Sequence, residues 1–426
     1  MNRGEAALLK RIGRMLDVTD ISEYERLGGF EGLKKTVEIG REELIHEIDI
    51  AKLRGRGGAA FPMGIKWRHL YESSTYPKYV VCNADEGEPG TFKDKFLLKE
   101  DPLAIIEGMI IAGYVFNSKS SFIYIRGEYR YIHSVFQKAL DNAKRAGYLG
   151  KNIIGIDGFD YEIYLVSGGG AYVCGENSAL LNSIEGKTGR PRVKPPHLAD
   201  VGLFLKPTLV NNVESFACVP HIAINGGQNF LDMGTPDGGG TKLICLSGHI
   251  KNPGTYEINL GTPLEELLYS EKYGGGSSNG KPIKFIHFGG QSGPIGFMKN
   301  LEGTIYSYEG LWDKNLSVGS GAIVVMDDSV SIVEYLENVM EFFVHESCGK
   351  CTPCRLGTKR VLEMIETFVR HEAAEGDIER LEDALTHITN LSACGLGQSI
   401  SVSIRSGLKQ AREEFEECLT SYRKEA

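Results

Sequence analysis

Apolar and polar positions in the first half of the chain alternate between strand and helix periods. Three apolar runs have the pattern of buried strands: 76–83, 121–127 and 161–170. Helical patterns separate these runs, one opening with Asp101 as N-cap and Pro102 at the first position, the other running from Glu128 to Ala146 before Gly147. Another helix begins with ENSALLNSIEG. This order predicts a parallel sheet covered by helices.

The pattern changes near residue 234, where GTPDGGGT is typical of a linker. Beyond it, two strands around an Asn-Pro-Gly turn, a short helix and another strand predict a small α+β unit. From about residue 330 apolar positions recur at three and four, which predicts four amphipathic helices in a bundle, the last from about Ser399 to Tyr422. We therefore divide the chain into a helical N-terminal segment with a Gly-rich end, an α/β domain, a small α+β domain and a helical bundle: 1–75, 76–238, 239–329 and 330–426.

Charge and hydropathy narrow the class of protein. The 426 residues include 47 basic and 56 acidic side chains, a net charge of −9, which disfavours nucleic acid as the main partner. No apolar run approaches the ~18 to 20 residues that span a bilayer, and the first residues do not resemble a secretory signal. We expect no direct membrane insertion, and a reducing compartment for the nine cysteines.

Three of these cysteines lie in one short stretch, ESCGKCTPCR, and a fourth follows in LSACGLG. A Cys-x-x-Cys redox pair would leave the third thiol of the stretch unexplained. Four thiolates can hold tetrahedral zinc or an iron–sulfur cluster. Zinc ribbons use two separate Cys-x-x-Cys pairs, whereas C-x2-C-x2-C with one remote cysteine is typical of a [4Fe–4S] cluster. The spacing favours the cluster, with zinc as the alternative, and the predicted bundle brings both cysteine loops to the same end.

A cluster accepts one electron at a time, so we expect a second cofactor. Gly55-Arg56-Gly57-Gly58-Ala59-Ala60 matches the dinucleotide fingerprint GxGxxA, but a helical pattern precedes it instead of a strand. The loop therefore predicts bare backbone N–H groups for a phosphate or the polar edge of a cofactor, or else a flexible surface loop.

Two further loops follow predicted strands at their carboxyl ends, where open α/β sheets bind ligands. One is the glycine-rich 167–176, and the other is the acidic 83–91. Carboxylates in the acidic loop would repel phosphate but accept hydrogen bonds from ribityl or ribose hydroxyls, unless the loop is only a solvated turn. Three such loops at one sheet edge favour a ligand site.

Several of these motifs together resemble one family. GRGGAAFPMGIKW, NADEGEPGTFKD, YIRGE, GAYVCGEN, EGKTGRPRVKPP, NNVES and ESCGKCTPCR are similar, in order and spacing, to the NADH-binding flavoprotein subunit of respiratory complex I. The similarity extends from about residue 50 to about 420. It implies a Rossmann-like FMN domain with a parallel sheet, a ubiquitin-like (β-grasp) domain and a C-terminal bundle that carries a [4Fe–4S] cluster.

The resemblance also implies residue roles by motif position. FMN would be held by Gly55, Arg56, Gly57, Lys66, Asn83, Asp85, Gly175, Glu176, Asn211 and Asn212. NADH would contact Gly58, Phe61, Glu86, Glu88, Tyr172 and Lys194. The cluster ligands would be Cys348, Cys351, Cys354 and Cys394.

Four positions depart from the family pattern. This chain has Ala60 and Asn177 where relatives commonly have Gly and Glu, and it has His69 and His197 where Phe is frequent. In the family those two rings flank the adenine, and imidazole stacks more weakly than a larger ring.

The implied function is that of the electron-entry subunit of an NADH–quinone oxidoreductase. Flavin accepts a hydride from NADH and releases electrons singly to the cluster. Hydride transfer needs no side-chain acid or base, so we name no catalytic residue. The implied partners are a small [2Fe–2S] subunit and a larger iron–sulfur subunit, in a cytoplasmic, peripheral position on the inner face of a membrane. The alternative is the diaphorase subunit of an NAD-linked hydrogenase or formate dehydrogenase.

Overall fold

A four-stranded parallel sheet forms the centre of the first half of the chain in the computed structural model, which describes residues 6–420. The strand order is β3-β2-β1-β4. The strands are β1 (Tyr79–Ala84), β2 (Ser120–Ile125), β3 (Glu162–Ser167) and β4 (Thr208–Asn212). Because β2 and β3 lie on one side of β1 and β4 lies on the other, the strand order reverses at β1. Open α/β sheets bind ligands at such a reversal, outside the carboxyl ends of the strands.

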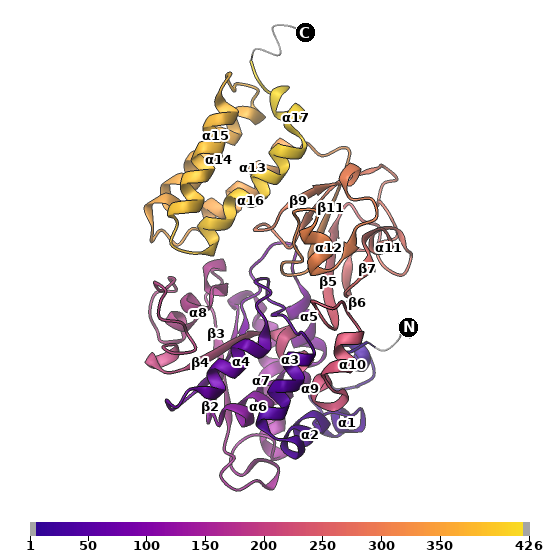
Figure 1. Ribbon diagram of the computed structural model, residues 1–426, viewed down its shortest axis with the longest axis vertical. Helices are drawn as coiled ribbons and strands as arrows, with labels where there is room; N and C mark the ends of the chain where they lie inside the picture. Colours follow the sequence, from indigo (N-terminus) through magenta and orange to yellow (C-terminus); the bar gives the residue numbers. More distant parts are fainter. Residues whose placement is uncertain (1–5, 421–426) are drawn as a thin grey trace. The chain divides into compact units, whose positions relative to one another are not determined.

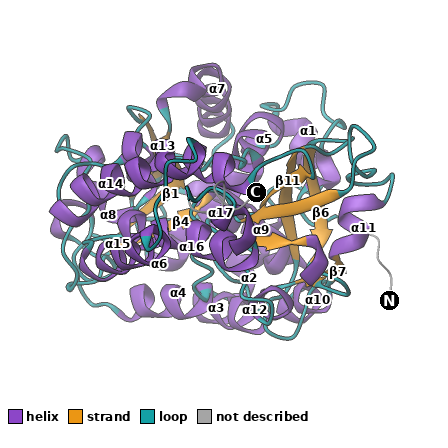
Figure 2. Cartoon of the chain, turned by 90° about the horizontal axis from the view of Figure 1, so that it is seen from above, coloured by secondary structure: helices purple, strands orange, loops and turns teal. Residues whose placement is uncertain are grey.

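Helices pack against this sheet and against each other (Figure 2). They are α1 (Ile21–Arg26), α2 (Glu31–Ile39), α3 (Arg41–Ile50), α4 (Met63–Glu72), α5 (Lys93–Glu100), α6 (Pro102–Phe116), α7 (Arg130–Arg145), α8 (Asn177–Ile184), α9 (Val213–Asn225) and α10 (Gly227–Asp232). Helix α6 is buried on nearly all sides and contacts β1, β2 and α9. It begins as predicted: the Asp101 side chain accepts the Ala104 N–H, and Pro102 occupies the first turn.

A second sheet has five strands in the order β6-β5-β11-β8-β9. Its strands are β5 (Thr241–Gly248), β6 (Gly254–Asn259), β8 (Ile283–Phe288), β9 (Ile295–Phe297) and β11 (Ala322–Asp327). Strand β11 pairs parallel with β5 and antiparallel with β8. Strands β5 and β11, the first and last of the five in sequence, are therefore parallel neighbours in the centre of the sheet. A hairpin lies on either side of this pair, as in a β-grasp fold. The smaller elements of the segment are β7 (Thr262–Pro263), β10 (Ile305–Tyr306), α11 (Leu264–Tyr269) and α12 (Tyr308–Trp312).

Four long helices near the C-terminus form the predicted bundle, drawn in orange and yellow in Figure 1. They are α13 (Ile332–Glu346), α14 (Thr352–Val369), α15 (Asp377–Leu391) and α16 (Gly395–Gln410). Consecutive helices contact each other, and α16 also contacts α13. In the part of the chain that the structure describes, no helix has both the length and the apolar character needed to cross a bilayer.

The predicted bounds of the last helix are wrong. Helix α16 begins at Gly395 and ends at Gln410, and a short helix α17 (Arg412–Glu416) follows, while Tyr422 lies outside the described residues. The glycines of GLGQ allow the early start, because a Cβ at Gly397 would lie 2.4 Å from Ser392 Oγ. The helix ends where Ala411 leaves helical geometry at φ −131°.

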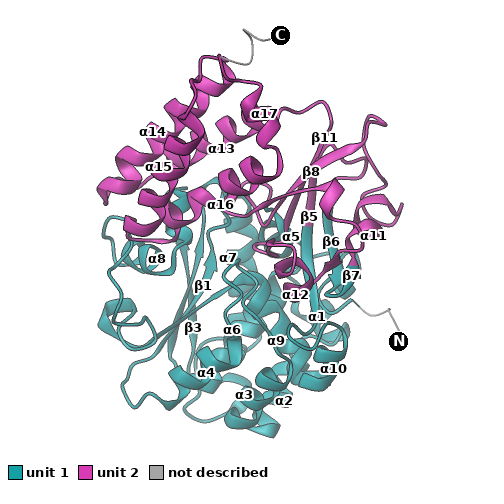
Figure 3. Ribbon diagram, turned by 45° about the horizontal axis from the view of Figure 1, so that its top comes forward, with its two compact units in different colours: residues 1–87, 91–244, 255–262 teal, residues 88–90, 245–254, 263–426 magenta. Residues whose placement is uncertain are grey.

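The chain divides into two units, which are coloured separately in Figure 3. The first runs up to Gly87 and adds Thr91–Ile244 and Thr255–Thr262. The second comprises Glu88–Gly90, Cys245–Gly254 and the chain from Pro263 onward. The four segments predicted from the sequence remain a prediction.

Candidate cofactor-binding sites

Three asparagines lie at the carboxyl ends of β1 and β4, where the strand order reverses. In the parallel register Asn83 is opposite Asn212, and Cys82 is opposite Asn211. The Asn83 amide donates to the Gly175 carbonyl at 2.9 Å, which ties the loop before α8 to β1. The Asn211 side chain is buried at 6% exposure, and its amide nitrogen has no hydrogen-bond partner. A buried donor without an acceptor lowers the stability of the fold, and a ligand oxygen that accepts its hydrogen bond would remove this cost.

The Gly-rich loop lies between α3 and α4, so no strand precedes it, as the sequence indicates. Its ends are closed by a hydrogen bond of 2.9 Å from the Gly55 N–H to the Phe61 carbonyl. A Cβ at Gly57 would lie only 3.1 Å from the Cβ of Asn212. The bare backbone of the loop therefore lies directly against Asn212, at the carboxyl end of β4.

Arg56 anchors the Gly-rich loop through both its backbone N–H and its side chain. Its N–H donates to Ser215 Oγ at 2.9 Å, and its buried guanidinium donates to the Gly239 carbonyl at 2.7 Å. The positive charge also lowers the pKa of Glu214, although burial opposes that change and the two nearby lysines contribute more. The sequence assigned Arg56 to the flavin; the structure places its side chain in a buried ion cluster.

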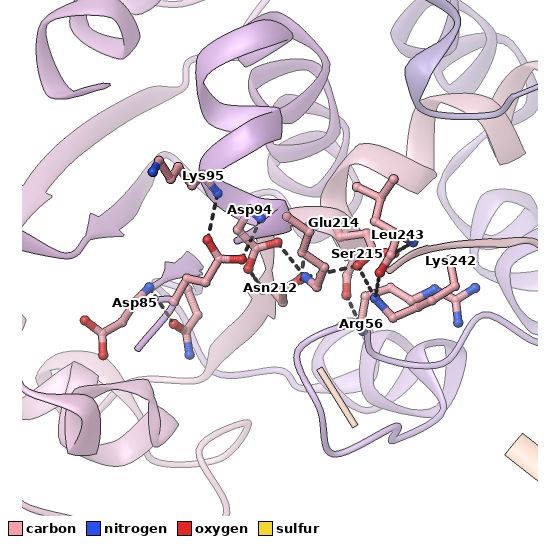
Figure 4. Close-up of polar contacts among 12 residues, drawn as sticks. Arg56, Asp85, Asp94, Lys95, Asn212, Glu214, Ser215, Lys242 and Leu243 are labelled. Atoms are coloured by element: carbon pink, nitrogen blue, oxygen red, sulfur yellow. Dashed lines mark hydrogen bonds and ion pairs between the residues drawn. The ribbon is translucent and has the colours of Figure 1, made fainter. Parts of the chain in front are cut away.

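That cluster was not found from the sequence (Figure 4). Glu214 Oε2 accepts from Lys242 Nζ at 2.6 Å and lies 3.0 Å from Lys93 Nζ. Lys93 also pairs with Asp94 at 2.6 Å, and the other Asp94 oxygen accepts from the Asn212 amide at 2.5 Å. These charges, all buried, join the N-termini of α5 and α9. They therefore fix Asn212, a residue assigned to the flavin.

Lys242 differs from Lys93 in the direction of its pKa shift. Burial lowers the pKa of Lys242 to about 8, and the positive charge of Lys93 adds to this effect, despite the bond to Glu214. Lys93 has Asp94 as a further carboxylate partner and its pKa is raised, whereas for Lys242 burial outweighs the attraction of Glu214. In the sequence the only signal was the presence of charged residues within the NADEGEPGTFKD and NNVES motifs.

Two cations assigned to ligands, Lys66 and Lys194, lie near enough to interact electrostatically. Lys66, on α4, donates to the Val210 carbonyl, and burial followed by the charge of Lys194 lowers the pKa of Lys66 to about 8. Lys194 pairs with Glu176 Oε1 at 2.8 Å. The other Glu176 oxygen caps α8 by accepting the N–H groups of Ser178 and Ala179. A phosphate placed near these lysines would compensate a positive charge that Glu176 balances only in part.

Glu86 has well-defined partners for both carboxylate oxygens. Oε1 accepts the Asp94 N–H at 2.7 Å, and Oε2 accepts the Lys95 N–H at 2.9 Å and the Tyr129 hydroxyl at 3.0 Å. Burial, and then the charge of Asp94, raise the pKa of Glu86 to about 7. The side chain thus caps α5, and a ribose hydroxyl would have to share oxygens that are already in use.

Glu88, two residues later, belongs to the second unit. Its carboxylate accepts the Ser292 N–H at 2.9 Å and the Ser292 hydroxyl at 3.1 Å. A Cβ at Gly290 would lie 2.2 Å from the Glu88 side chain, so the loop of residues 289–293 is shaped around this carboxylate.

The remaining residues assigned to NADH are partly accessible. Phe61 is 55% exposed, and Tyr172 lies against Gly87, where a Cβ would be 3.1 Å from the tyrosine ring. Gly58 has φ +125°, a conformation that favours glycine. His69 Nε2 lies 2.8 Å from Asp200 Oδ1. An adenine platform at this histidine, as at the exposed His197, remains a prediction.

The four cysteines assigned to the cluster lie at the starts of two bundle helices. Cys351 is the N-cap of α14 and Cys394 is the N-cap of α16. Gly349, at φ +70°, and a hydrogen bond from Arg355 to its carbonyl close the tight loop that holds Cys348. A Cβ at Gly397 would lie 3.3 Å from Cys354 Cβ, so the first loop lies beside the start of α16.

The thiols also interact electrostatically. Burial raises the pKa of Cys354 to about 11, and the other three thiols add to the rise. Burial also raises the pKa of Cys394, while the Leu396 and Gly397 N–H groups lower it. N–H groups at helix N-termini stabilise negative charge, which suits a cluster bound by thiolates.

Among residues 6–420, no three His, Cys, Asp or Glu side chains are placed to hold a single metal ion. A [4Fe–4S] cluster sets a different requirement, because each thiolate binds its own iron atom. The donor set fits such a cluster, although its ligands remain a prediction.

Two family models match separate parts of the chain. The family described as "Nuo51 FMN-binding domain" matches residues 48–221. The family described as "NADH-ubiquinone oxidoreductase-F iron-sulfur binding region" matches residues 334–418. The first match includes the loops at the edge of the parallel sheet, and the second includes all four cysteines.

Full-length relatives extend the match to nearly the whole chain. An NADH-quinone oxidoreductase F subunit of Rhizobium meliloti is 41% identical over 94% of this chain and 96% of its own length. The NADH-quinone oxidoreductase F subunit of Aquifex aeolicus is 41% identical over 98% of this chain and 95% of its own length. The HndC subunit of the NADP-reducing hydrogenase of Solidesulfovibrio fructosivorans is also 41% identical, over 94% and 81%.

Solved structures of an NAD+-reducing [NiFe]-hydrogenase share the fold. The H2-reduced form has a TM-score of 0.82 at 34% identity, over 89% of this chain. The air-oxidized form has a TM-score of 0.84 at 32% identity, over 98% of this chain. This chain spans 63% and 68% of those longer hydrogenase chains.

The two family matches define an oxidoreductase that uses a flavin and an iron–sulfur cluster. The chain belongs to the family of NADH-quinone oxidoreductase F subunits. It is an NADH dehydrogenase subunit of a multi-subunit enzyme, with FMN and a [4Fe–4S] cluster as cofactors. The predicted family, fold class, enzyme class, function and cofactors are thereby confirmed.

Proposed function

We propose that NADH is oxidised at the carboxyl edge of the parallel sheet, where FMN binds between β1, β4 and the Gly-rich loop. The observation that carries this assignment is the unpartnered Asn211 amide, buried where the strand order reverses. When bound, FMN supplies a group that accepts a hydride and releases single electrons.

The residues assigned to FMN divide into two kinds. Backbone and amide groups offer hydrogen bonds to its polar edge: Gly55, Gly57, Asn83, Gly175, Asn211 and Asn212. Charged side chains orient or neutralise: Lys66 suits the phosphate, whereas Asp85 and Glu176 suit hydroxyls. Arg56 acts through the backbone of its loop, because its guanidinium is bonded to Gly239.

For NADH, we assign Gly58, Phe61, Tyr172 and Lys194 to binding and orientation. Glu86 and Glu88 would disfavour the 2′-phosphate of NADPH by like-charge repulsion. Glu86→Gln and Glu88→Gln should therefore raise the use of NADPH relative to NADH. The matched control is Glu363→Gln, which removes an exposed carboxylate from α14. Equal NADPH use in all three variants would refute this role.

Electrons would leave through a [4Fe–4S] cluster held by Cys348, Cys351, Cys354 and Cys394. We further propose that the segments 76–238, 239–329 and 330–426 act as the FMN and NADH domain, the β-grasp domain and the cluster domain. A small [2Fe–2S] subunit and a larger iron–sulfur subunit are the proposed partners. The assembly would be peripheral on the inner face of a membrane.

The test is anaerobic reconstitution of the chain with FMN, iron and sulfide, followed by NADH titration. We expect a flavin spectrum that bleaches with NADH and an EPR signal from a reduced cluster. Asn211→Ala should weaken FMN binding about tenfold, as expected for one lost buried hydrogen bond. Asn225→Ala, at the exposed end of α9, should not. Tight FMN binding by both variants would exclude the carboxyl edge of the parallel sheet as the FMN site.

A second candidate is the diaphorase subunit of an NAD-linked hydrogenase. It is supported by the 41% identity to HndC and by the likeness to the NAD+-reducing hydrogenase. The two functions differ in the assembly, so the tagged chain should be isolated with its native partners. Quinone reduction by NADH supports the first function, and H2-dependent reduction of NAD+ supports the second.

A further inference from the structure

The loop after β2, Arg126-Gly127-Glu128-Tyr129, overlaps the YIRGE motif, and none of its residues was assigned to a ligand. Two of its side chains contact Glu86. Arg126 Nη1 donates to the Glu86 carbonyl, and the Tyr129 hydroxyl donates to Glu86 Oε2 at 3.0 Å. The Arg126 guanidinium also lies over the Tyr129 ring, 5.5 Å from its centroid. One loop therefore holds both the backbone and the carboxylate of Glu86.

Arg126 also connects this contact to the loop after β3. Its Nε and Nη2 donate to the two oxygens of Glu128 at 3.0 and 2.6 Å, a bidentate pair. A Cβ at Gly170 would lie 2.8 Å from the Glu128 carboxylate. The pair thus reaches from Glu86, after β1, to Gly170, after β3.

A surface ion pair would be the simpler explanation, and such pairs contribute little. The low exposure of the Arg126 side chain argues against a simple surface ion pair. Glu128 is 51% exposed, but the Arg126 side chain is only 18% exposed, and it has a backbone carbonyl as an additional acceptor. Lysine could keep one of these bonds but could not form the fork.

We propose that Arg126 and Tyr129 are positioning residues that hold Glu86 in place for NADH. This inference rests on the proposed role of Glu86 as an NADH contact. Neither side chain needs to touch the substrate. Their effect would be on the affinity for NADH, since Glu86 is not required for the hydride transfer itself.

The first experiment compares Arg126→Gln with Arg130→Gln, which removes an exposed arginine four residues further along. NADH binding is titrated by NADH fluorescence on the flavin-free chain, and NADH oxidation is measured on the FMN-loaded chain. For Arg126→Gln we expect Kd and KM to rise about tenfold, as for loss of a charge-assisted hydrogen bond, with kcat within about twofold and FMN content unchanged. The Kd and KM of Arg126→Lys should lie between those of the unmodified chain and those of Arg126→Gln. Arg130→Gln should match the unmodified chain.

A double-mutant comparison tests whether the effect passes through Glu86. Tyr129→Phe should also raise KM, and Arg126→Gln should raise it no further in a Glu86→Ala background. An unchanged Kd in Arg126→Gln, or a full additional effect in the Glu86→Ala background, would overturn the inference. A loss of FMN that parallels the loss of NADH affinity would also overturn it, because it would indicate a general structural role. Failure of the unmodified chain to oxidise NADH would instead count against the proposed function.

Discussion

Replacing Glu214 with glutamine is expected to destabilise the first unit strongly. Glu214 is fully buried and accepts from Lys242 at 2.6 Å and from the Leu243 N–H at 2.8 Å, with Lys93 at 3.0 Å. The substitution keeps the shape of the side chain but leaves two buried ammonium groups without their shared carboxylate. Breaking a buried ion pair in this way costs about 3–5 kcal/mol.

The cluster also predicts an order among variants. Lys242→Met should cost less than Glu214→Gln, because Glu214 would keep Lys93 and the Leu243 N–H. The double variant Glu214→Gln with Lys242→Met should be more stable than Glu214→Gln alone, since it removes one of the two buried ammonium groups that lose the Glu214 carboxylate. Glu363→Gln, in an exposed pair with Arg360, should change stability by less than about 0.5 kcal/mol.

Thermal and urea unfolding of the FMN-loaded chain would measure these differences. At roughly 2–4 °C per kcal/mol for a unit of this size, Glu214→Gln should lower Tm by about 6–20 °C. FMN should also be released more easily, because Lys93 and Asp94 hold Asn212. A loss below about 1 kcal/mol, or a double variant no better than Glu214→Gln, would refute the view that these charges are desolvated and interdependent.

Four further outcomes are expected. Ala60 has φ +52°, so Ala60→Gly should stabilise the chain by up to about 1 kcal/mol in urea unfolding, and a clear loss would contradict the strain. The raised pKa of Glu86, about 7, means that this group stabilises the fold below about pH 4.5 and loses that contribution as pH rises through 7; Glu86→Gln should flatten this part of the stability profile. Burial lowers the pKa of His287 to about 4, so stability should fall as pH drops from 6.5 through 4, and His287→Gln should remove that fall. Cys394→Ser should abolish the bound iron and sulfide but retain FMN, and an intact cluster in this variant would exclude Cys394 as a ligand.

Elements with strong periodicity were predictable from the sequence. Strands β1 to β3 are apolar runs between turns, and α6 has both a clear N-cap and a buried apolar length. The bundle helices α13 to α15 were predicted from apolar residues that recur every three or four positions. Strand β4 was missed because Thr208–Asn212 is short and ends in two polar residues. Its extended form depends on pairing with β1, which local sequence does not specify.

The site was predictable at the level of loops but less so at the level of side chains. The carboxyl ends of β1 and β3 could be identified from the order of strands and glycines, and the cysteine spacing indicated the cluster. Glu86 and Glu88 look equivalent in NADEGE, yet one caps a helix and the other binds a serine of the second unit. Ser292 is 204 residues from Glu88 along the chain, so tertiary packing sets this contact and the sequence could not distinguish the two carboxylates.

The buried charges explain how this fold holds a Gly-rich loop without the strand that usually supports one. In a dinucleotide-binding turn, the preceding strand and following helix fix the glycines. Here the loop follows a helix, and its glycines provide almost no side-chain packing. Arg56 compensates by bonding to Ser215 and Gly239, while Glu214 and its lysines fix the start of α9 on which the loop lies. The ion cluster thus takes over the supporting role of the missing strand, and the backbone of the loop remains free for a ligand.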